Sequence, residues 1–530
     1  MGLPRYIEAL LSPRAYPEGP RSVELRQTHI SYLFFTPEFV YKVKKPVDFG
    51  FLDFTTLEKR KKYCAEEVRL NRRLAADVYM GVVSVTEKDG LVSIDGEGGE
   101  VDCAVKMKRL KTDTMLDEMI KSGRVTEDII RRVAERIFLF HKDAATDTRI
   151  STFGSPDVIR KNTGENFSQT ENFKGELISE GAYSGIKSYT EGFIDCHTAL
   201  FEKRVRDGFI RDCHGDIHTE HISIEDSINI IDCIEFNERF RFSDIVSDMA
   251  FLSMDLDFLN RSDLSRIFVN TYFSLSGRDE GGKLLDFYKG YRAFVRAKVE
   301  GFKYLEPEVG EEERKDALID ALHHFHLAGL YARGGFKPQL IIVCGLSGTG
   351  KSAIARAIAE SSRAVRISSD NIRKDMAGVP ARRQRPEPFG KGIYSRKFTE
   401  KTYERLISTG VGLLRAGRST VLDATFSRNI FIEKAVKEAL KAGVPAGLIR
   451  IIECTAPDDV IRARLLERPR GPLPQGEALP DMTWEIFGLQ KASYEKKTIK
   501  RLVLDGTKSL ENNAIEAIKW VFSTEEKSDG

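Results

Sequence analysis

The chain has 530 residues, of which 41% are hydrophobic and 31% are charged, and its formal net charge is +2. Because a single hydrophobic core rarely grows to this size, the length predicts about two to four domains. The balanced charge shows no overall basic excess of the kind that a nucleic-acid scaffold needs, but net charge does not exclude local basic patches.

The cysteines and the first residues bear on where the protein works. Its 7 cysteines are scattered and form no CxxC pair, which argues against a disulfide framework or a zinc ribbon and suits a reducing cytosol. Residues 1–20 lack the apolar stretch of a signal peptide, and nowhere is an apolar run long enough to span a bilayer. We therefore expect a soluble, cytoplasmic protein with no membrane partner.

The first part of the chain is rich in short strands and then mostly helical. Period-two alternation and turn residues predict strands within residues 22–45, 82–90, 91–97 and 101–110, with a turn at 36–38 and a helix over 57–76. From about residue 114 to 210 the pattern is mostly helical. A small β-rich lobe (about 1–112) followed by a helical lobe (about 113–335) is similar to the layout of kinase-like phosphotransferases.

The helical lobe contains the segment DCHGDIHTEHI at residues 212–222, followed after a turn by Ile230-Ile231-Asp232. It resembles the catalytic loop HGDxxxxN and the metal-binding Asp of the aminoglycoside phosphotransferase and choline kinase superfamily. An acceptor hydroxyl needs one carboxylate to take its proton, and Mg²⁺ on the transferring phosphate needs another. The resemblance implies that Asp216 is the base and Asp232 the metal ligand.

The same resemblance covers roughly residues 25–330 and extends to the small lobe. It implies that Lys42 contacts the nucleotide phosphates and that Glu67, on the following helix, is its ion-pair partner. Strand alternation puts Lys44 on the same face as Lys42, and Glu66 adjoins Glu67, so both alternatives stay open.

One position departs from the family pattern, because His221 stands where the second metal-binding Asn is expected. Imidazole is a softer donor than the oxygen ligands that Mg²⁺ prefers. The site could hold one firmly bound ion, favour Mn²⁺, or mainly bind nucleotide. A zinc site formed by His214, His218 and His221 is a further reading, although the spacing matches no common structural zinc pattern.

A second part begins after the turn at residues 332–338, where Gly334 and Gly335 suit a helix C-cap and Pro338 cannot continue a helix. An apolar strand there leads into a glycine-rich loop and an alanine-rich helix, which is the pattern of a phosphate-binding loop. Lys351 is expected at the β/γ-phosphates of ATP and Ser352 on Mg²⁺. The predicted nucleotide-binding residues of the loop are Gly345, Ser347, Gly348, Thr349, Gly350, Lys351 and Ser352.

Strand-like and helical runs alternate from the loop to the end of the chain, which predicts a parallel sheet with helices on both faces. This half resembles the P-loop kinases, including gluconate kinases, zeta toxins and the 5′-kinase domain of polynucleotide kinase. The resemblance implies that Asp370 is the acceptor base and that Arg373 binds the acceptor. Asp423 is the Walker B candidate for Mg²⁺. Charge-stabilising arginines of a closing segment are expected at Arg464 and Arg468.

The whole chain is similar to bacterial fusions of an aminoglycoside phosphotransferase-like domain with a P-loop kinase. The resemblance implies an α+β kinase-like domain over residues 1–335 and an α/β P-loop domain over 336–530. We expect ATP and Mg²⁺ as cofactors and a hydroxyl-bearing acceptor, either a small molecule or a nucleic-acid end. Two alternatives are a regulatory front domain with a catalytic rear domain, and a nucleotide-gated interaction protein. The oligomeric state is left open.

Overall fold

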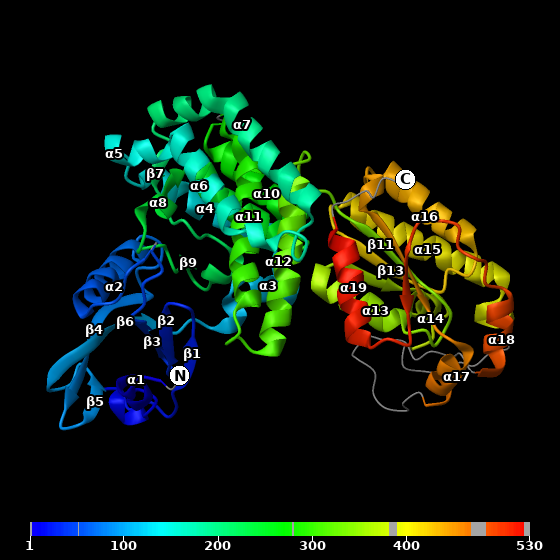
Figure 1. The fold of residues 1–530 in the computed structure, drawn as a ribbon, viewed down its shortest axis with the longest axis horizontal. Helices are drawn as coiled ribbons and strands as arrows, with labels where there is room; N and C mark the ends of the chain where they lie inside the picture. The colour runs from blue at the N-terminus through cyan, green and yellow to red at the C-terminus, as the bar shows by residue number, and fades with distance from the viewer. Residues whose placement is uncertain (1–2, 51, 278–279, 381–389, 468–483, 524–530) are drawn as a thin grey trace. The chain divides into compact units, whose positions relative to one another are not determined.

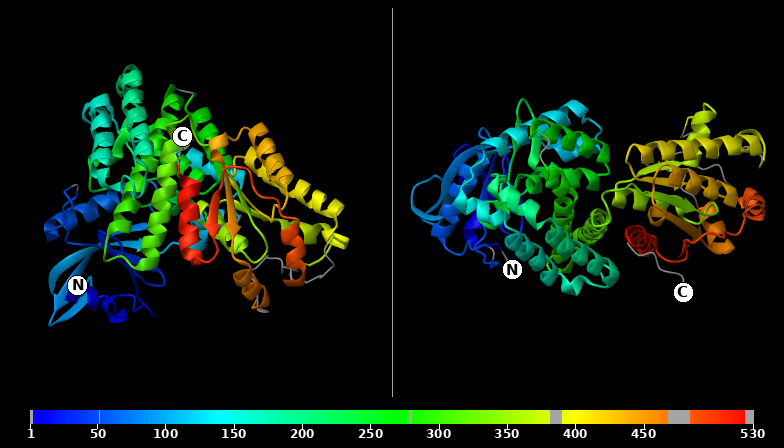
Figure 2. Two further views of the ribbon diagram at one scale, coloured as in Figure 1. Left: turned by 45° about the vertical axis from the view of Figure 1, so that its right-hand side comes forward. Right: turned by 90° about the horizontal axis from the view of Figure 1, so that it is seen from above.

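The computed structural model describes residues 3–50, 52–277, 280–380, 390–467 and 484–523 (Figures 1 and 2). They form two compact units, each assembled from separate stretches of the chain. Unit 1 comprises Met1–Asn162, Phe193–Asp255 and Arg266–Tyr288, and unit 2 comprises Thr163–Gly192, Leu256–Ser265 and Lys289–Gly530. Within the described ranges, no helix combines the length and the hydropathy needed to cross a membrane.

Unit 1 begins with a six-stranded antiparallel sheet in the order β1-β2-β3-β6-β4-β5 (Figure 1, blue). The predicted turn joins β2 to β3, where the Thr36 hydroxyl accepts a hydrogen bond of 3.0 Å from the Phe39 N–H. The elements of this lobe are α1 (Arg5–Ala9), β1 (Glu24–Gln27), β2 (Ser31–Phe35), β3 (Phe39–Lys44), α2 (Leu57–Asn71), β4 (Tyr79–Lys88), β5 (Leu91–Ile94) and β6 (Gly99–Lys108).

Alternation along β3 decides which of its side chains meet helix α2. Tyr41 and Val43 pack into one apolar cluster, whereas Val40 packs into the cluster that contains Cys64 and Val68 of α2. Because successive strand residues point to opposite faces, the even-numbered positions of β3 face α2. The two lysines of this strand therefore lie on the helix side of the sheet.

The rest of unit 1 is mainly helical, with two short antiparallel sheets of two strands each: β7 with β10, and the hairpin of β8 with β9. The loop between β7 and β8 carries the HGD segment, and β9 ends just before Asp232. The elements from here to the second part, some of which continue into unit 2, are α3 (Leu116–Lys121), α4 (Glu127–Asp143), α5 (Thr148–Ser151), α6 (Pro156–Gln169), α7 (Glu180–Arg206), β7 (Ile210–Asp212), β8 (Ile222–Ile224), β9 (Ile228–Ile230), α8 (Glu238–Arg241), β10 (Phe242–Asp244), α9 (Ile245–Phe258), α10 (Ser262–Leu275), α11 (Leu285–Leu305) and α12 (Glu311–Tyr331).

Unit 2 contains a five-stranded parallel sheet in the order β12-β13-β11-β14-β15. Helices α13 and α19 lie on one face and α15 and α16 on the other (Figure 1). The predicted fold class, a β-rich and helical kinase-like part followed by an α/β P-loop part, is confirmed. The elements are β11 (Leu340–Cys344), α13 (Lys351–Ser362), β12 (Val365–Ser368), α14 (Ser369–Met376), α15 (Arg396–Arg415), β13 (Thr420–Asp423), α16 (Asn429–Lys441), β14 (Ile449–Thr455), α17 (Asp458–Leu466), α18 (Trp484–Ala492), β15 (Leu502–Asp505) and α19 (Leu510–Phe522).

Helix α12 ends where Gly334 and Gly335 adopt positive φ angles of 98° and 99°, and the Gly335 N–H donates to the Leu330 carbonyl at 3.2 Å. The helix itself belongs to unit 2, where its His323 stacks on Phe522 of α19 with ring centroids 4.6 Å apart. Residues 289–335 are thus grouped with the P-loop part, and the domain boundary at residue 335 stays a prediction.

Candidate active sites

The glycine-rich loop of unit 2 has a backbone that only glycine supports at its first position. Gly345 has a φ of 138°, and a Cβ atom there would lie 2.3 Å from the carbonyl oxygen of Cys454. Gly348 and Gly350 also have positive φ angles, of 87° and 94°. Bare backbone N–H groups can therefore approach an anion, and α13 starts at Lys351 with the positive end of its dipole at the loop. The loop fits the triphosphate that its sequence predicts.

Ser352 and Asp423, the residues predicted to hold Mg²⁺ in the rear site, lie together. The Ser352 hydroxyl donates to Asp423 Oδ1 at 3.3 Å, and Asp423 is only 2% exposed at the end of β13. Arg366 of β12 donates to the other carboxylate oxygen through Nη2 at 2.7 Å and Nε at 3.2 Å. Sequence reasoning missed Arg366, although a charged residue inside the strand run AVRISS was the available signal.

A cavity of about 430 Å³ opens over the loop of unit 2. It is lined by Lys351, Ser352 and Asp370, together with Arg366, Asn371 and Arg464. Asp370 lies in the first turn of α14, directly after β12, at the carboxyl end of the parallel sheet. This edge is where open α/β sheets bind ligands.

The predicted arginines of the rear site have different surroundings. Arg464 donates to the carbonyl oxygens of Gly506 at 2.6 Å and Gly348 at 3.4 Å, so it lies beside the phosphate loop. Arg373 is 7% exposed and donates to the Ile393 carbonyl at 2.5 Å. It is not among the described residues that line the cavity. Arg468 lies outside the described residues.

In unit 1 the structure brings Lys42, Glu67 and Asp232 together. Lys42 Nζ lies 2.9 Å from Glu67 Oε1 and 2.6 Å from Asp232 Oδ1. Burial opposes the charge on Lys42, but the carboxylates of Asp232 and Glu67 outweigh burial and raise its pKa well above the ordinary value. Lys44 Nζ lies 2.6 Å from the other oxygen of Glu67, so both lysines share this carboxylate. The alternative Glu66 is bound to the exposed Arg69 instead.

His221 lies between the predicted base and the predicted metal ligand. Its Nδ1 is 3.0 Å from the backbone carbonyl oxygen of Asp216, and because a carbonyl can only accept, Nδ1 carries the proton of this hydrogen bond. Its Nε2 faces Asp232 Oδ2 at 3.7 Å. A ligating histidine commonly donates its other N–H to a carbonyl, so this arrangement suits a metal ion held between Nε2 and Asp232. His218 Nε2 lies 3.7 Å from Asp216 Oδ2.

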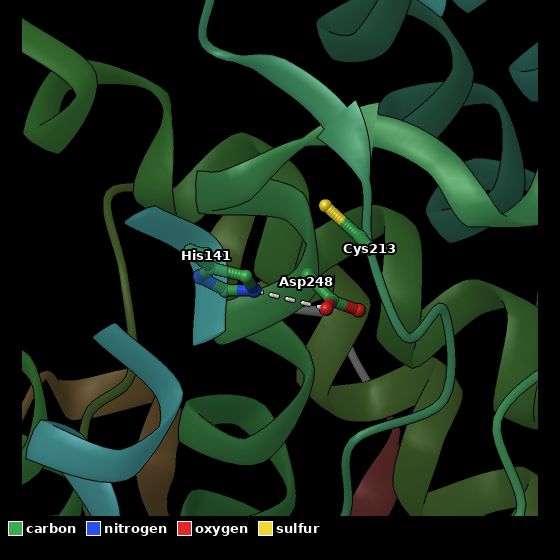
Figure 3. Close-up of side chains that lie close together, drawn as sticks. All are labelled: His141, Cys213 and Asp248. Carbon is green, nitrogen blue, oxygen red and sulfur yellow. Dashed lines mark hydrogen bonds and ion pairs between the residues drawn. The ribbon is translucent and has the colours of Figure 1, made fainter. Parts of the chain in front are cut away.

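Asp248 of α9 binds the backbone of the HGD loop, residues 214–216. The backbone N–H groups of His214 and Gly215 donate to its carboxylate at 2.9 and 2.8 Å, and His141 Nε2 lies 3.0 Å from the same group (Figure 3). Cys213 completes the buried cluster. Because the Asp248 oxygens bind the loop backbone, this cluster positions Asp216. Burial lowers the pKa of His214 to about 3, so His214 is neutral in the folded protein.

This chain is similar to a protein family and to several known proteins. Residues 340–495 match a family model described as an AAA domain. The choline/ethanolamine kinase family protein from Mesorhizobium loti is 11% identical, with a TM-score of 0.35, and the match covers 63% of this chain and 100% of that one. The APS kinase CysC of Mycobacterium tuberculosis is 19% identical, with a TM-score of 0.26 over 36% of this chain and 99% of that one.

The chain is also similar over most of its length to the uncharacterized protein Rv2004c of Mycobacterium tuberculosis. The two sequences are 30% identical over 450 residues, which cover 85% of this chain and 87% of the mycobacterial one. A match of this length includes Asp216 and Asp232 of the front site as well as the phosphate loop of the rear site. The chain belongs to the same protein family as this mycobacterial protein.

Proposed function

We propose that unit 2 is an ATP-dependent kinase that transfers the γ-phosphate of ATP to a hydroxyl group of an acceptor. The observation that carries this proposal is the cavity in which the glycine loop, Ser352 and Asp370 meet. Lys351 would bind the β/γ-phosphates, and Ser352 with Asp423 would hold Mg²⁺. When bound, Mg²⁺ neutralises charge on the triphosphate. Asp370 would orient the acceptor hydroxyl and take its proton.

We propose four candidate classes of acceptor: a sugar, an amino alcohol, a nucleoside or the end of an RNA. A screen with γ-labelled ATP separates them. We expect Lys351→Ala to lower the rear-site rate about 10²- to 10³-fold, because it removes one charged contact to the phosphates. Lys441→Ala, which changes an exposed lysine of α16, is the matched control. Unchanged transfer in Lys351→Ala, with the front site also disabled by Asp232→Asn, would refute the rear kinase.

For unit 1 we propose a second phosphotransfer site. The support is the convergence of Lys42, Glu67 and Asp232 on one side of His221 and of Asp216 on the other. In this arrangement Lys42 would bind phosphate oxygens and Asp232 the divalent cation. Asp216 would be the acceptor base. The test is Asp216→Asn in a Gly345→Ala background, in which the rear site is expected not to bind nucleotide: transfer should disappear while Mg·ATP still binds to the front site.

A second candidate role for unit 1 is that of a module that binds nucleotide without transferring phosphate. The observation that favours it is the imidazole of His221, which stands where the family pattern has a metal-binding Asn. With Nε2 facing Asp232, His221 suits Mn²⁺ better than an Asn oxygen would, whereas an Asn suits Mg²⁺. We therefore expect His221→Asn to shift the preference of the front site from Mn²⁺ toward Mg²⁺, measured by nucleotide binding in each metal. If Asp216→Asn leaves all chemistry intact, unit 1 is a nucleotide-binding or regulatory module.

A further inference from the structure

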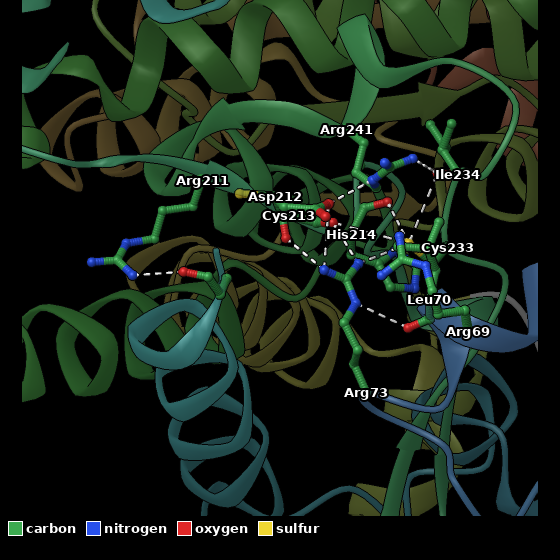
Figure 4. A network of polar contacts seen from close by, with 12 residues as sticks. Arg69, Leu70, Arg73, Arg211, Asp212, Cys213, His214, Cys233, Ile234 and Arg241 are labelled. Atoms are coloured by element: carbon green, nitrogen blue, oxygen red, sulfur yellow. Dashed lines mark hydrogen bonds and ion pairs between the residues drawn. The ribbon is translucent and has the colours of Figure 1, made fainter. Parts of the chain in front are cut away.

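Two side chains at the C-terminal end of helix α2 contact the segments on either side of the front site, and Figure 4 shows one of them, Arg73. Arg73, two residues past the end of the helix, donates to the carbonyl oxygens of Asp212 at 2.7 Å and Cys213 at 2.9 Å. The same guanidinium donates to Cys233 Sγ at 3.3 Å, and its Nε donates to the Leu70 carbonyl at 3.0 Å. One side chain thus connects the segment that leads into the HGD loop, the segment that follows Asp232 and helix α2.

Asn71 makes a second connection from the same helix. Its Oδ1 accepts a hydrogen bond of 2.9 Å from the Cys233 N–H, and its Nδ2 donates to the Glu67 carbonyl at 2.9 Å. Asn71 is 1% exposed, so water does not compete for these bonds. The residue that follows Asp232 is therefore tied to the helical turn that carries Glu67.

The backbone at Asp232 needs such support. Asp232 has a φ of 64°, a left-handed conformation that costs a non-glycine residue free energy and persists only when its surroundings impose it. Arg241 adds to the same network by donating to Asp212 Oδ1 at 2.6 Å and to the Ile234 carbonyl at 2.9 Å. The segments that carry Asp216 and Asp232 are thereby held to each other as well as to α2.

We propose that Arg73 is a positioning residue of the front site. It sets the separation of Asp216 and Asp232, and it holds helix α2 against their segments so that Glu67 stays in place. The inference rests on the proposed nucleotide and metal binding of unit 1. It follows from the shape of the guanidinium, whose planar fork can bond two carbonyls and a thiol at once. A lysine offers a point charge and cannot span the three groups in this way.

The test uses the full chain with Gly345→Ala, the change expected to abolish nucleotide binding at the rear site, so that Mg·ATP binding reports on the front site. We expect Arg73→Lys to raise the half-saturating Mg²⁺ concentration for ATP binding about 10- to 100-fold, the usual effect of removing support behind a metal ligand. Binding of metal-free ATP should change little. Arg69→Met is the matched control, since Arg69 lies on the same helix and pairs with Glu66 at the surface.

The outcomes separate this inference from the proposed function. The parent of these variants is the full chain with the rear site disabled. If it binds Mg·ATP and the further change Asp232→Asn abolishes the Mg²⁺ dependence, the proposed nucleotide and metal site of unit 1 is supported. An unchanged Mg²⁺ requirement in folded Arg73→Lys and Arg73→Met would then overturn the positioning role, even if both variants melt at lower temperature. A parent with no Mg²⁺-dependent binding in unit 1 would overturn both the site and the inference.

Discussion

The ion pair between Arg366 and Asp423 can be tested by a double-mutant cycle. Asp423 is 2% and the Arg366 side chain 17% exposed, so each change leaves a poorly solvated partner behind. Breaking a buried pair from one side typically costs 3 to 5 kcal/mol, so we expect about 3 kcal/mol for Arg366→Met and somewhat less for Asp423→Asn, which keeps an acceptor oxygen. The double variant should cost less than the sum, with a coupling of about 2 kcal/mol.

The chain offers a convenient probe for this cycle. Its 2 tryptophans, Trp484 and Trp520, both belong to unit 2, so tryptophan fluorescence during urea unfolding follows this unit. In thermal melts, a loss of about 3 kcal/mol should lower the transition by roughly 6 °C or more. A coupling below about 0.5 kcal/mol, the usual error of additivity, would refute the view that Arg366 holds the Asp423 carboxylate.

Three further predictions concern the two sites. Asp370→Asn should bind ATP like the parent but lose transfer by about 10²- to 10⁴-fold, the usual contribution of a general base, and equal loss of both would make Asp370 structural. Gly345→Ala should abolish nucleotide binding at the rear site, because its Cβ atom would meet a carbonyl oxygen at 2.3 Å. Gly443→Ala, also at positive φ but with open space, should bind normally in the same titration. Burial lowers the pKa of His214 from 6.5 to about 3, so the unfolded chain binds more protons between these values and stability should fall as the pH falls through this window. Circular dichroism of urea unfolding should show a shallower fall in His214→Gln, and an equal fall would refute this role.

Much of the fold could be predicted from local patterns. The alternation of strands and helices after residue 340 indicates a parallel sheet, and the observed sheet is parallel throughout. The order of its strands could not be predicted, because β11 pairs with β13 and β14 across long stretches of chain. Such pairing depends on packing between distant segments, which local periodicity does not record.

The ambiguity between Lys42 and Lys44 has a physical explanation. A strand places residues two apart on one face, so alternation alone cannot choose between them. In the structure, both lysines bind Glu67, one to each carboxylate oxygen, at 2.9 and 2.6 Å. Adjacent residues of a helix point in different directions, and this separates Glu67, which is buried, from Glu66, which lies at the surface with Arg69.

The acceptor-binding role of Arg373 stays a prediction, because motif spacing does not fix the direction in which its side chain extends. Asp370 and Arg373 are three residues apart on α14, which puts them on neighbouring sides of one helix and suggests a shared pocket. A long side chain can still turn away, and here Arg373 binds the Ile393 carbonyl and the Thr399 hydroxyl. Those partners lie 20 and 26 residues further along the chain. The cation that contacts the predicted metal-binding carboxylate, Arg366, could not be found by spacing either: its partner Asp423 lies 57 residues away and becomes its neighbour only because β12 pairs with β13.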